Sequence, residues 1–203
     1  EGELDGWRSA IEVKHVLDNY SSLLIGCGLG MTREVYKLVQ NLLFSNVAIP
    51  PTVIDADGLN VIAKFYEWWD RISDDVILTP HPGEMSRLTG LPINEIQSDR
   101  LQVARFYARK WRKIVVLKGA CTVIASPRGE ALLNDTSNPA LASAGTGDVL
   151  AGIVTGLVTQ GVSLLSAATL GVYVHSQVAC NISERVGNSG LLASDMLYEI
   201  PSV

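Results

Sequence analysis

The segment Asn134 to Asp148 ends in a glycine-rich turn with an acid and leads directly into a long apolar stretch. Gly145 and Gly147 lack a Cβ atom, so the backbone there can turn sharply and approach a phosphate, toward which the free N–H groups of a following helix would point. Asp148 falls in the first turn of that helix, where the helix dipole favours the ionised carboxylate. These residues predict an anion-binding turn with a general base beside it. The alternative is an ordinary helix-start acid behind a glycine-shaped loop.

Two further segments follow the first two short apolar runs of the chain. Gly26-Cys-Gly-Leu-Gly30 follows the first, and its glycines would let a ligand approach the backbone at a helix start. Such a string also fits the nucleotide loop of a methyltransferase or a dinucleotide-binding fold. Residues 55–60 follow the second run, and a carboxylate there would orient a hydroxyl or hold a Mg²⁺-bound water. Asp57 has the equal alternative of capping the helix that follows.

The third and fourth apolar runs also end in polar segments. Thr79-Pro-His-Pro-Gly-Glu84 brackets His81 with prolines, which stiffen the backbone and fix where the ring points. We therefore expect His81 to be a binding contact, although an isolated histidine is more often a packing residue. Glu84 is expected to be a first-turn acid or a group that positions a substrate. Lys118 follows the fourth run, where it would meet a phosphate, and a solvated lysine is the plain alternative.

The segments between these motifs predict an open α/β sheet with helices on both faces. Short apolar runs that end at a polar residue, glycine or proline are typical of strands covered on both sides, and they occur at residues 22–25, 52–55, 76–79 and 114–118. Helical periodicity separates them, at residues 33–43, 58–69 and 95–111. Strands and helices in alternation give right-handed crossovers and a mostly parallel sheet, which binds ligands outside the carboxyl ends of its strands.

The pattern changes in the last third of the chain. Short strands at residues 122–126 and 131–134 flank a Pro-Arg-Gly turn, which predicts an antiparallel hairpin at one edge of the sheet. Three helices are expected to finish the chain, at residues 147–159, 164–183 and 194–199. Gly152 and Gly156 lie on one face of the first of these, and we expect them to allow dense packing of a neighbouring element.

Composition limits the class of protein. The 203 residues, 47% of them hydrophobic and 18% charged, predict a single domain over residues 1–203. The net charge is −5 and the longest basic cluster is residues 109–113, expected to be the exposed end of a helix, so a nucleic-acid partner or an anionic membrane surface is not expected. Polar side chains within residues 164–182 favour a buried soluble helix there over a membrane span.

The three cysteines, Cys27, Cys121 and Cys180, have neither metal-ligand nor disulfide-framework spacing. We expect them to be reduced, buried thiols of a cytoplasmic protein. The apolar faces of the expected helices indicate contacts between subunits, so a homo-oligomer is expected as well.

Taken in order, the motifs resemble those of one enzyme family. They are Gly26-Cys-Gly-Leu-Gly30, Asp55-Ala-Asp-Gly-Leu-Asn60, Thr79-Pro-His-Pro-Gly-Glu84, Leu117-Lys-Gly-Ala120 and Ser143-Ala-Gly-Thr-Gly-Asp-Val-Leu150. The set is similar to that of the ADP/ATP-dependent NAD(P)H-hydrate dehydratases of the ribokinase-like superfamily, and the resemblance covers nearly the whole chain. It implies a ribokinase-like fold and a carbon–oxygen lyase that returns the S-epimers of hydrated NADH and NADPH (NADHX and NADPHX) to NAD(P)H. Such an enzyme consumes ADP, or ATP in the alternative, with Mg²⁺ as cofactor, and releases AMP and phosphate from ADP.

The resemblance also implies roles for individual residues. Asp148 would be the catalytic base and would face the substrate hydroxyl. The other residues implied to contact the hydrated dinucleotide are Gly28, Gly30, Asp57, Asn60, His81 and Glu84. Those implied to bind the nucleotide are Lys118, Gly119, Ala120, Cys121, Thr122, Asn138, Gly145, Thr146 and Gly147.

Three departures from the family pattern stand out. Cys27 replaces a proline that is usual in the family, and Ser137 and Ala140 stand where glycine is common. The family's first strand and its glycine-rich loop would precede Glu1, so a truncated N-terminus is expected. The main alternative is a ribokinase-like kinase of a vitamin-precursor alcohol, against which the His81 segment argues. A methyltransferase, resting only on residues 26–30, and a non-catalytic binding protein are the remaining alternatives.

Overall fold

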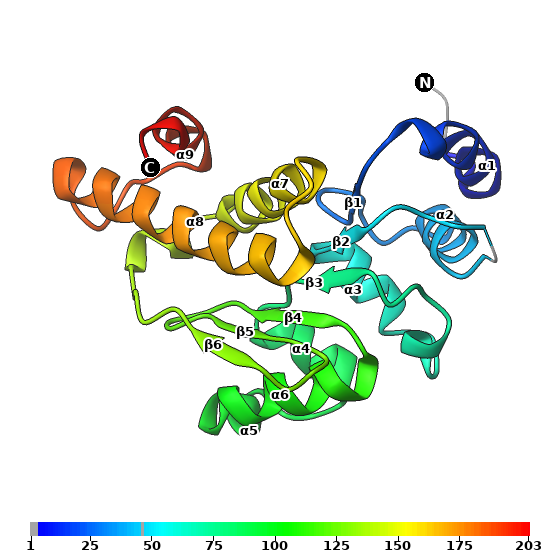
Figure 1. Cartoon of the computed structure of the whole chain (residues 1–203), viewed down its shortest axis with the longest axis horizontal. Helices are drawn as coiled ribbons and strands as arrows, with labels where there is room; N and C mark the ends of the chain where they lie inside the picture. The colour runs from blue at the N-terminus through cyan, green and yellow to red at the C-terminus, as the bar shows by residue number, and fades with distance from the viewer. Residues whose placement is uncertain (1–3, 46) are drawn as a thin grey trace.

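The computed structural model of the protein describes residues 4–45 and 47–203. A six-stranded sheet whose strands lie in sequence order forms its centre (Figure 1). Strands β1 to β4 are parallel, whereas β5 and β6 form an antiparallel hairpin at one edge. The strands are β1 (Leu23–Ile25), β2 (Thr52–Ile54), β3 (Val76–Leu78), β4 (Ile114–Leu117), β5 (Val123–Ala125) and β6 (Ala131–Leu133). The fold class expected from the sequence is therefore confirmed.

Helices cover both faces of the sheet, as the apolar runs require. One face carries α1 (Gly6–Val16), α2 (Arg33–Leu43), α3 (Ala56–Ile62), α4 (Pro82–Thr89), α5 (Ile93–Ser98) and α6 (Arg100–Trp111). The other face carries α7 (Thr146–Thr159) and α8 (Leu164–Val186), drawn in yellow and orange in Figure 1. The last helix, α9 (Ala193–Glu199), packs against the C-terminal half of α8.

Successive strand residues enter two different hydrophobic cores. Ile54 and Leu78 pack with α2, α3, α4 and α6, while Val53 and Ile77 pack with α7 and α8. All four side chains are fully buried. Because neighbouring residues of a strand point to opposite faces, only a continuous apolar run can fill both cores, and each such side chain contributes roughly 1.5–3 kcal/mol.

The expected helix at residues 58–69 is shorter than the sequence pattern suggested. Helix α3 begins at Ala56 and ends at Ile62, and the chain then turns through Glu67, whose φ is +48°, into a 3-10 turn at Trp68–Asp70. Trp68 is buried against Trp111 with ring centroids 5.0 Å apart. The apolar residues after Ile62 therefore fill the core from a turn, which helical periodicity alone does not distinguish from a helix.

The expected helix at residues 95–111 is in fact two helices. The chain breaks at Asp99, whose φ of −147° and ψ of 66° end α5 and whose carboxylate accepts a hydrogen bond from the Gln102 N–H at the start of α6. An aspartate at this position satisfies one of the free N–H groups of the new helix.

The basic cluster at residues 109–113 is only partly the exposed helix end that was expected. Lys113 follows α6 and is fully buried. Its Nζ donates to Asp74 Oδ1 at 3.2 Å and to the Trp111 carbonyl at 3.1 Å. Burial of the ammonium lowers the pKa of Lys113, and the hydrogen bond from Lys113 to Asp74 opposes that shift.

Helix α1 was not foreseen from the sequence. It starts at Asp5, whose carboxylate accepts from the N–H groups of Trp7 and Arg8, and it packs on α2 through Gly6. A Cβ at Gly6 would lie 1.9 Å from the Glu34 carbonyl oxygen, so only glycine allows this approach. The strand expected before Glu1 lies outside the described residues.

The structure also bears on the long apolar helices and on the cysteines. Across residues 4–45 and 47–203, no helix has the length and apolar character needed to span a membrane. Cys27, Cys121 and Cys180 are unpaired, and each is partly exposed rather than buried.

Candidate active site

Lys118 connects the motifs that follow three different strands. It comes directly after β4, and its Nζ donates to Asp55 Oδ1, after β2, at 2.6 Å. The same Nζ lies 3.9 Å from Glu84 Oε2, on the helix that follows β3. Asp55 and Glu84 are buried, with 1% and 5% exposure. The carboxyl ends of the parallel strands therefore bring one ammonium and two carboxylates together, as the topology predicts.

The ends of β1 and β2 meet through a glycine. Gly26 has a φ of +131°, and a Cβ there would lie 1.8 Å from the Asp55 carbonyl oxygen. The next residue after Asp55, Ala56, also has a positive φ, of +47°. This close approach fixes where the Asp55 side chain leaves the strand.

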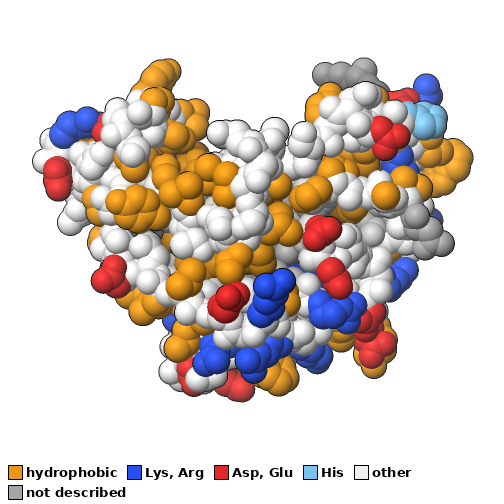
Figure 2. All heavy atoms as spheres, viewed as in Figure 1, with side chains coloured by type: hydrophobic (Ala, Val, Ile, Leu, Met, Phe, Trp, Pro, Cys, Tyr) orange, Lys and Arg blue, Asp and Glu red, His pale blue; other side chains and the backbone are white. Residues whose placement is uncertain are grey.

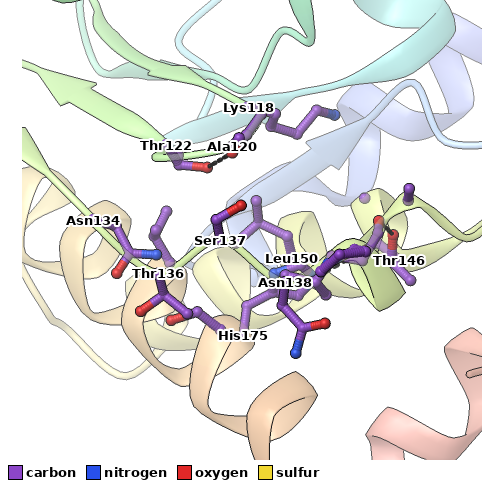
Figure 3. Close-up of a pocket in the computed structure, with 17 residues that line it drawn as sticks. Lys118, Ala120, Thr122, Asn134, Thr136, Ser137, Asn138, Thr146, Leu150 and His175 are labelled. Atoms are coloured by element: carbon purple, nitrogen blue, oxygen red, sulfur yellow. Dashed lines mark hydrogen bonds between the residues drawn. The ribbon is translucent and has the colours of Figure 1, made fainter. Parts of the chain in front are cut away.

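A cavity of about 300 Å³ lies beside Lys118 (Figure 3). Lys118, Ala120 and Thr122 form one wall, while the loop before α7 and the helices α7 and α8 form the opposite wall (Figure 3). Seven of the nine residues expected to bind nucleotide line it, namely Lys118, Gly119, Ala120, Thr122, Asn138, Thr146 and Gly147. Segments that are distant in sequence thus enclose one space of the size of a small ligand.

The other two expected nucleotide residues do not line this cavity. Cys121 lies in the turn after β4 with a φ of +58°, and its thiol is 3.9 Å from the Asp135 carbonyl. Gly145 is the residue before α7, and its φ of +85° sets the direction in which the helix starts. Both residues shape the wall without contributing a surface to the space.

The start of α7 faces the cavity. Thr146 is held by its hydroxyl, which donates to the carbonyls of Leu141 and Ser143 at 2.7 and 2.8 Å. A Cβ on Gly147 would lie 3.3 Å from Lys118 Nζ and 3.9 Å from Asp55 Oδ2. The first N–H groups of a helix have no partner within the helix, so this end is suited to bind an anion next to Lys118.

His175 was not among the residues selected from the sequence. It lies on α8, is 8% exposed, lines the cavity, and its Nε2 is 2.8 Å from the Thr146 carbonyl oxygen. Burial lowers the pKa of His175 to about 4, although the hydrogen bond to Thr146 opposes the shift. The neutral ring therefore donates from Nε2. A histidine inside an apolar helix was the available signal.

Asn134, Thr136 and Ser137, in the loop before α7, line the same cavity. They belong to the segment 134–148 that the sequence marks, but the sequence assigns them no individual binding role. Their sequence is polar and without periodicity, so only the fold shows that the loop crosses the cavity mouth.

Asp148 lies on the other side of the α7 start from the cavity. It is exposed, and one of its oxygens lies within 4.8 Å of Asp55 and of the Cys27 thiol. Burial and a hydrogen bond to Asp148 raise the pKa of Cys27 to about 12, so the thiol keeps its proton. A carboxylate at this helix end is available to accept a proton from a substrate hydroxyl.

His81 and Glu84 form a capping box at the start of α4. His81 Nδ1 accepts from the N–H groups of Gly83 and Glu84, at 2.9 and 3.3 Å, and Glu84 Oε2 accepts from the His81 N–H at 2.8 Å. Burial, followed by the Lys118 charge, lowers the pKa of His81. Burial raises the pKa of Glu84 to about 7, with Lys118 opposing the shift. The first-turn acid expected at Glu84 is confirmed.

Of the remaining expected substrate residues, Gly28 and Gly30 are exposed, and Asp57 and Asn60 are partly buried. Gly28 and Gly30 have φ values of +67° and +75°, and a Cβ on either would meet no atom within 4 Å. The Gly30 N–H donates to Asp57 Oδ2 at 2.7 Å, so Asp57 holds this turn instead of capping α3. Asn60 Oδ1 accepts from Arg87 at 3.2 Å. These four residues thus lie at the ends of β1 and β2.

A second, apolar groove of about 590 Å³ runs along α7 and α9. Asp148, Gly152 and Gly156, all on α7, line it. Within the described residues, no neighbouring atom lies within 4 Å of a Cβ placed at either glycine. The prediction of dense packing at Gly152 and Gly156 is therefore wrong. Figure 2 shows the molecule hollowed between α9 and α1, above α7, with hydrophobic side chains on the α9 side.

The chain is similar over almost its whole length to known proteins of one family. A family model described as NAD(P)H-hydrate dehydratase matches residues 4–202. The chain belongs to the NAD(P)H-hydrate dehydratase family. The ADP-dependent (S)-NAD(P)H-hydrate dehydratase of Bacillus subtilis is 36% identical over 98% of this chain, which spans 69% of that enzyme. The bifunctional NAD(P)H-hydrate repair enzyme of Moorella thermoacetica is 43% identical over 89% of this chain, which spans 34% of that enzyme.

Solved structures agree with the family assignment. The B. subtilis ADP/ATP-dependent NAD(P)H-hydrate dehydratase, co-crystallised with ATP and Mg²⁺, superposes with a TM-score of 0.82 and 36% identity over 98% of this chain and 68% of that chain. A hydroxyethylthiazole kinase from Pyrococcus horikoshii shares the fold, with a TM-score of 0.75 at 16% identity over 95% of this chain and 76% of that chain. A ribokinase-like sheet is thus confirmed, and the NAD(P)H-hydrate dehydratase family is favoured over a methyltransferase.

Proposed function

We propose that this member of the NAD(P)H-hydrate dehydratase family removes water from the S-epimers of NADHX and NADPHX at the expense of ADP, yielding NAD(P)H, AMP and phosphate. The proposal rests on one observation above all. The ammonium of Lys118 lies between the 300 Å³ cavity and Asp55, and Asp148 lies beside the same carboxylate. A phosphoryl donor bound in the cavity would therefore lie next to a base, Asp148.

The chemistry follows from the leaving group. Hydroxide leaves a carbon poorly, whereas phosphate leaves well. We infer that the substrate hydroxyl attacks the terminal phosphoryl group of ADP while Asp148 accepts its proton, and that AMP departs. The C–O bond of the phosphorylated intermediate then breaks, phosphate takes the electron pair, and loss of a ring proton restores the dihydronicotinamide. Positioned proton transfer contributes typically ~10²–10⁴-fold.

The residues around the cavity have matching tasks. Lys118 would balance charge on the transferring group, and the N–H groups at the start of α7, near Gly147, would donate to its oxygens. Gly119, Ala120, Thr122 and Asn138, with the buried His175 side chain, would surround the nucleotide, since all of them line the cavity. On the side of the strand ends, Gly28, Gly30, Asp57, Asn60 and His81 would contact the dinucleotide.

A magnesium ion fits the oxygens available here. Asp55 Oδ2 is buried and, within the described residues, has no hydrogen-bond partner, whereas Oδ1 accepts from Lys118. Asp55 and the exposed Asp148 would hold the ion, directly or through water, together with phosphate oxygens. When bound, Mg²⁺ would stabilise the charge on the phosphoryl group.

The experiment is an assay of ADP-dependent recovery of NADH absorbance from S-NADHX, with the Asp148→Asn variant. We expect turnover to fall by about 10²–10⁴-fold while ADP binding persists, because the variant loses the base and keeps the helix start. The matched control is Asp18→Asn, because Asp18 is an exposed acid near the N-terminus and far from Asp148 in the sequence. Its turnover should equal that of the unmodified protein. Equal turnover by Asp148→Asn would refute the assignment. A stable phosphorylated product without NADH would instead indicate the vitamin-precursor kinase alternative.

We also propose that the protein is a homo-oligomer and that it is cytoplasmic. A homo-oligomer is supported by large exposed apolar side chains on α8 and α9, including Leu170, Tyr173, Leu197 and Tyr198. A cytoplasmic location is supported by the three unpaired cysteines. Light scattering on the purified protein tests the first, and fractionation of the host cell tests the second.

A further inference from the structure

A thiol and two carboxylates converge at the point where β1, β2 and α7 meet. One ligand atom from each of Cys27, Asp55 and Asp148 lies within 4.8 Å of the others. Cys27 follows β1, Asp55 follows β2, and Asp148 is in the first turn of α7. Two carboxylates beside a thiol repel one another, so the arrangement calls for a counter-charge.

Asp55 supplies an independent indication that a ligand belongs here. The side chain is 99% buried, and in the part of the chain that the structure describes its Oδ2 has no partner. A buried oxygen without a partner destabilises the fold, and it does so more when the group is charged. Lys118 neutralises the carboxylate through Oδ1 only, at 2.6 Å. Oδ2 is therefore free for a second cation, either the proposed Mg²⁺ or a metal ion that competes with it.

The sum of nearby charges favours a dication. In the metal-bound state, in which Cys27 has lost its proton, Asp55, Asp148 and the Cys27 thiolate carry −3 together, and Lys118 returns +1. The N-terminus of α7 adds the equivalent of roughly +0.5. The net charge around the site is then about −1.5, and this charge attracts a divalent cation.

We propose that Cys27, Asp55 and Asp148 form a site for a thiophilic divalent cation, with Zn²⁺ as the representative, and that its occupancy inhibits the dehydratase by engaging Asp148. The inhibitory part rests on the proposed function, whereas the binding part does not. On binding, the metal–sulfur bond replaces the S–H bond of Cys27 and the proton passes to solvent. A thiolate selects Zn²⁺ or Cd²⁺ over Mg²⁺, which prefers oxygen ligands alone.

The geometry needs only small side-chain movements. Zinc bonds of about 2.0–2.3 Å place tetrahedral ligand atoms roughly 3.5 Å apart. The present separations are within 4.8 Å, and both Cys27 and Asp148 have solvent on one side into which they can adjust. Three protein ligands leave a position for water, as in open zinc sites.

Titration of the full chain with Cd²⁺ is the direct test, because a cadmium–thiolate bond has its own ultraviolet charge-transfer band. We expect one equivalent with that band in the unmodified protein and in Cys180→Ser and Cys121→Ser, the matched thiol controls. Cys27→Ser should lose the band, and Zn²⁺ affinity should fall at least about tenfold in both Cys27→Ser and Asp148→Asn. A band that survives in Cys27→Ser, or complete displacement of Cd²⁺ by excess Mg²⁺, would overturn the site.

The inhibitory part has a separate readout. Micromolar Zn²⁺ added to the dehydratase assay should lower turnover, and a chelator should restore it. Cys27→Ser should need at least about tenfold more Zn²⁺ for the same inhibition, relative to its own zinc-free rate. If Zn²⁺ binds through Cys27 and turnover is unchanged, the inhibitory role is wrong and the metal site stands. If no variant or unmodified protein turns over S-NADHX, the proposed function fails and the Cd²⁺ titration still decides the site.

Discussion

Lys118 Nζ and Asp55 Oδ1 lie 2.6 Å apart although their strands, β4 and β2, are separated by β3. The two side chains meet above the end of β3, and their exposure differs, since the side chain of Lys118 is 18% exposed and that of Asp55 is 1% exposed. A partner that can reach water tolerates the loss of its counter-charge better than one that cannot.

We therefore expect an asymmetry between two single variants. Lys118→Met leaves a buried, unpaired carboxylate and should lower the free energy of unfolding by about 3 kcal/mol, near the lower end for broken buried pairs. Asp55→Asn leaves an ammonium near solvent and should cost clearly less. The double variant should be more stable than Lys118→Met alone. Urea denaturation measures all three, and equal costs for the two single variants would contradict the argument.

His175 should make the protein sensitive to acid. Its pKa is about 4 in the folded state and 6.5 when exposed, so the unfolded chain binds more protons between these values. Stability from His175 is therefore complete above pH 6.5 and is lost as the pH falls toward 4, by on the order of 3 kcal/mol. His175→Asn should flatten the stability profile in this window. The difference at pH 8, where the ring is neutral in both states, isolates the hydrogen bond to Thr146, and a parallel profile at lower pH would refute the prediction.

Glu84 should act in the opposite direction. Its pKa is about 7 in the folded state against 4.5 when exposed, so the folded protein binds more protons between these values. The stability that Glu84 contributes is present below pH 4.5 and is lost as the pH rises through 7, again by on the order of 3 kcal/mol. Glu84→Gln keeps the capping geometry and should gain stability relative to the unmodified protein between pH 5 and 8. A constant difference across that range would show that Glu84 does not titrate there.

Gly147 should be needed for nucleotide binding. A methyl group there would lie 3.3 Å from Lys118 Nζ and would intrude at the start of α7. Gly147→Ala should weaken ADP binding about tenfold, which is about 1.4 kcal/mol, as measured by calorimetry. Gly152→Ala, on the same helix with open space around it, is the control and should leave ADP affinity unchanged while raising helix stability by up to about 1 kcal/mol. Equal ADP affinity in both variants would exclude close backbone approach at Gly147.

The strand ends could be located from the sequence because their signals are local. Each apolar run stops at the polar residue that reaches the site, as at Asp55 and Lys118, and the parallel topology then brings these ends together. The turn around Gly145 and Gly147 was equally visible, since glycine marks backbone that must bend or be approached.

Other features depend on packing that no local pattern records. The ring of His175 meets the start of α7 only because α8 crosses it, and Lys113 is buried because Asp74, far away in the sequence, accepts its hydrogen bond. The sequence is compatible with Asp57 as a helix cap or as a ligand contact. Neither pattern predicts the hydrogen bond that Asp57 accepts from the Gly30 N–H. Helix breaks such as Asp99 depend on competition between a side chain and the helix backbone, which periodicity averages away.

The shared ammonium of Lys118 has a thermodynamic consequence. A polyphosphate that draws it into the cavity leaves Asp55 more negative, and a cation held at Asp55 releases Lys118 toward the polyphosphate. Linkage then requires that each occupant change the affinity of the other by the same factor. The polyphosphate site in the cavity and the cation site at Asp55 are in that sense a single coupled binding unit.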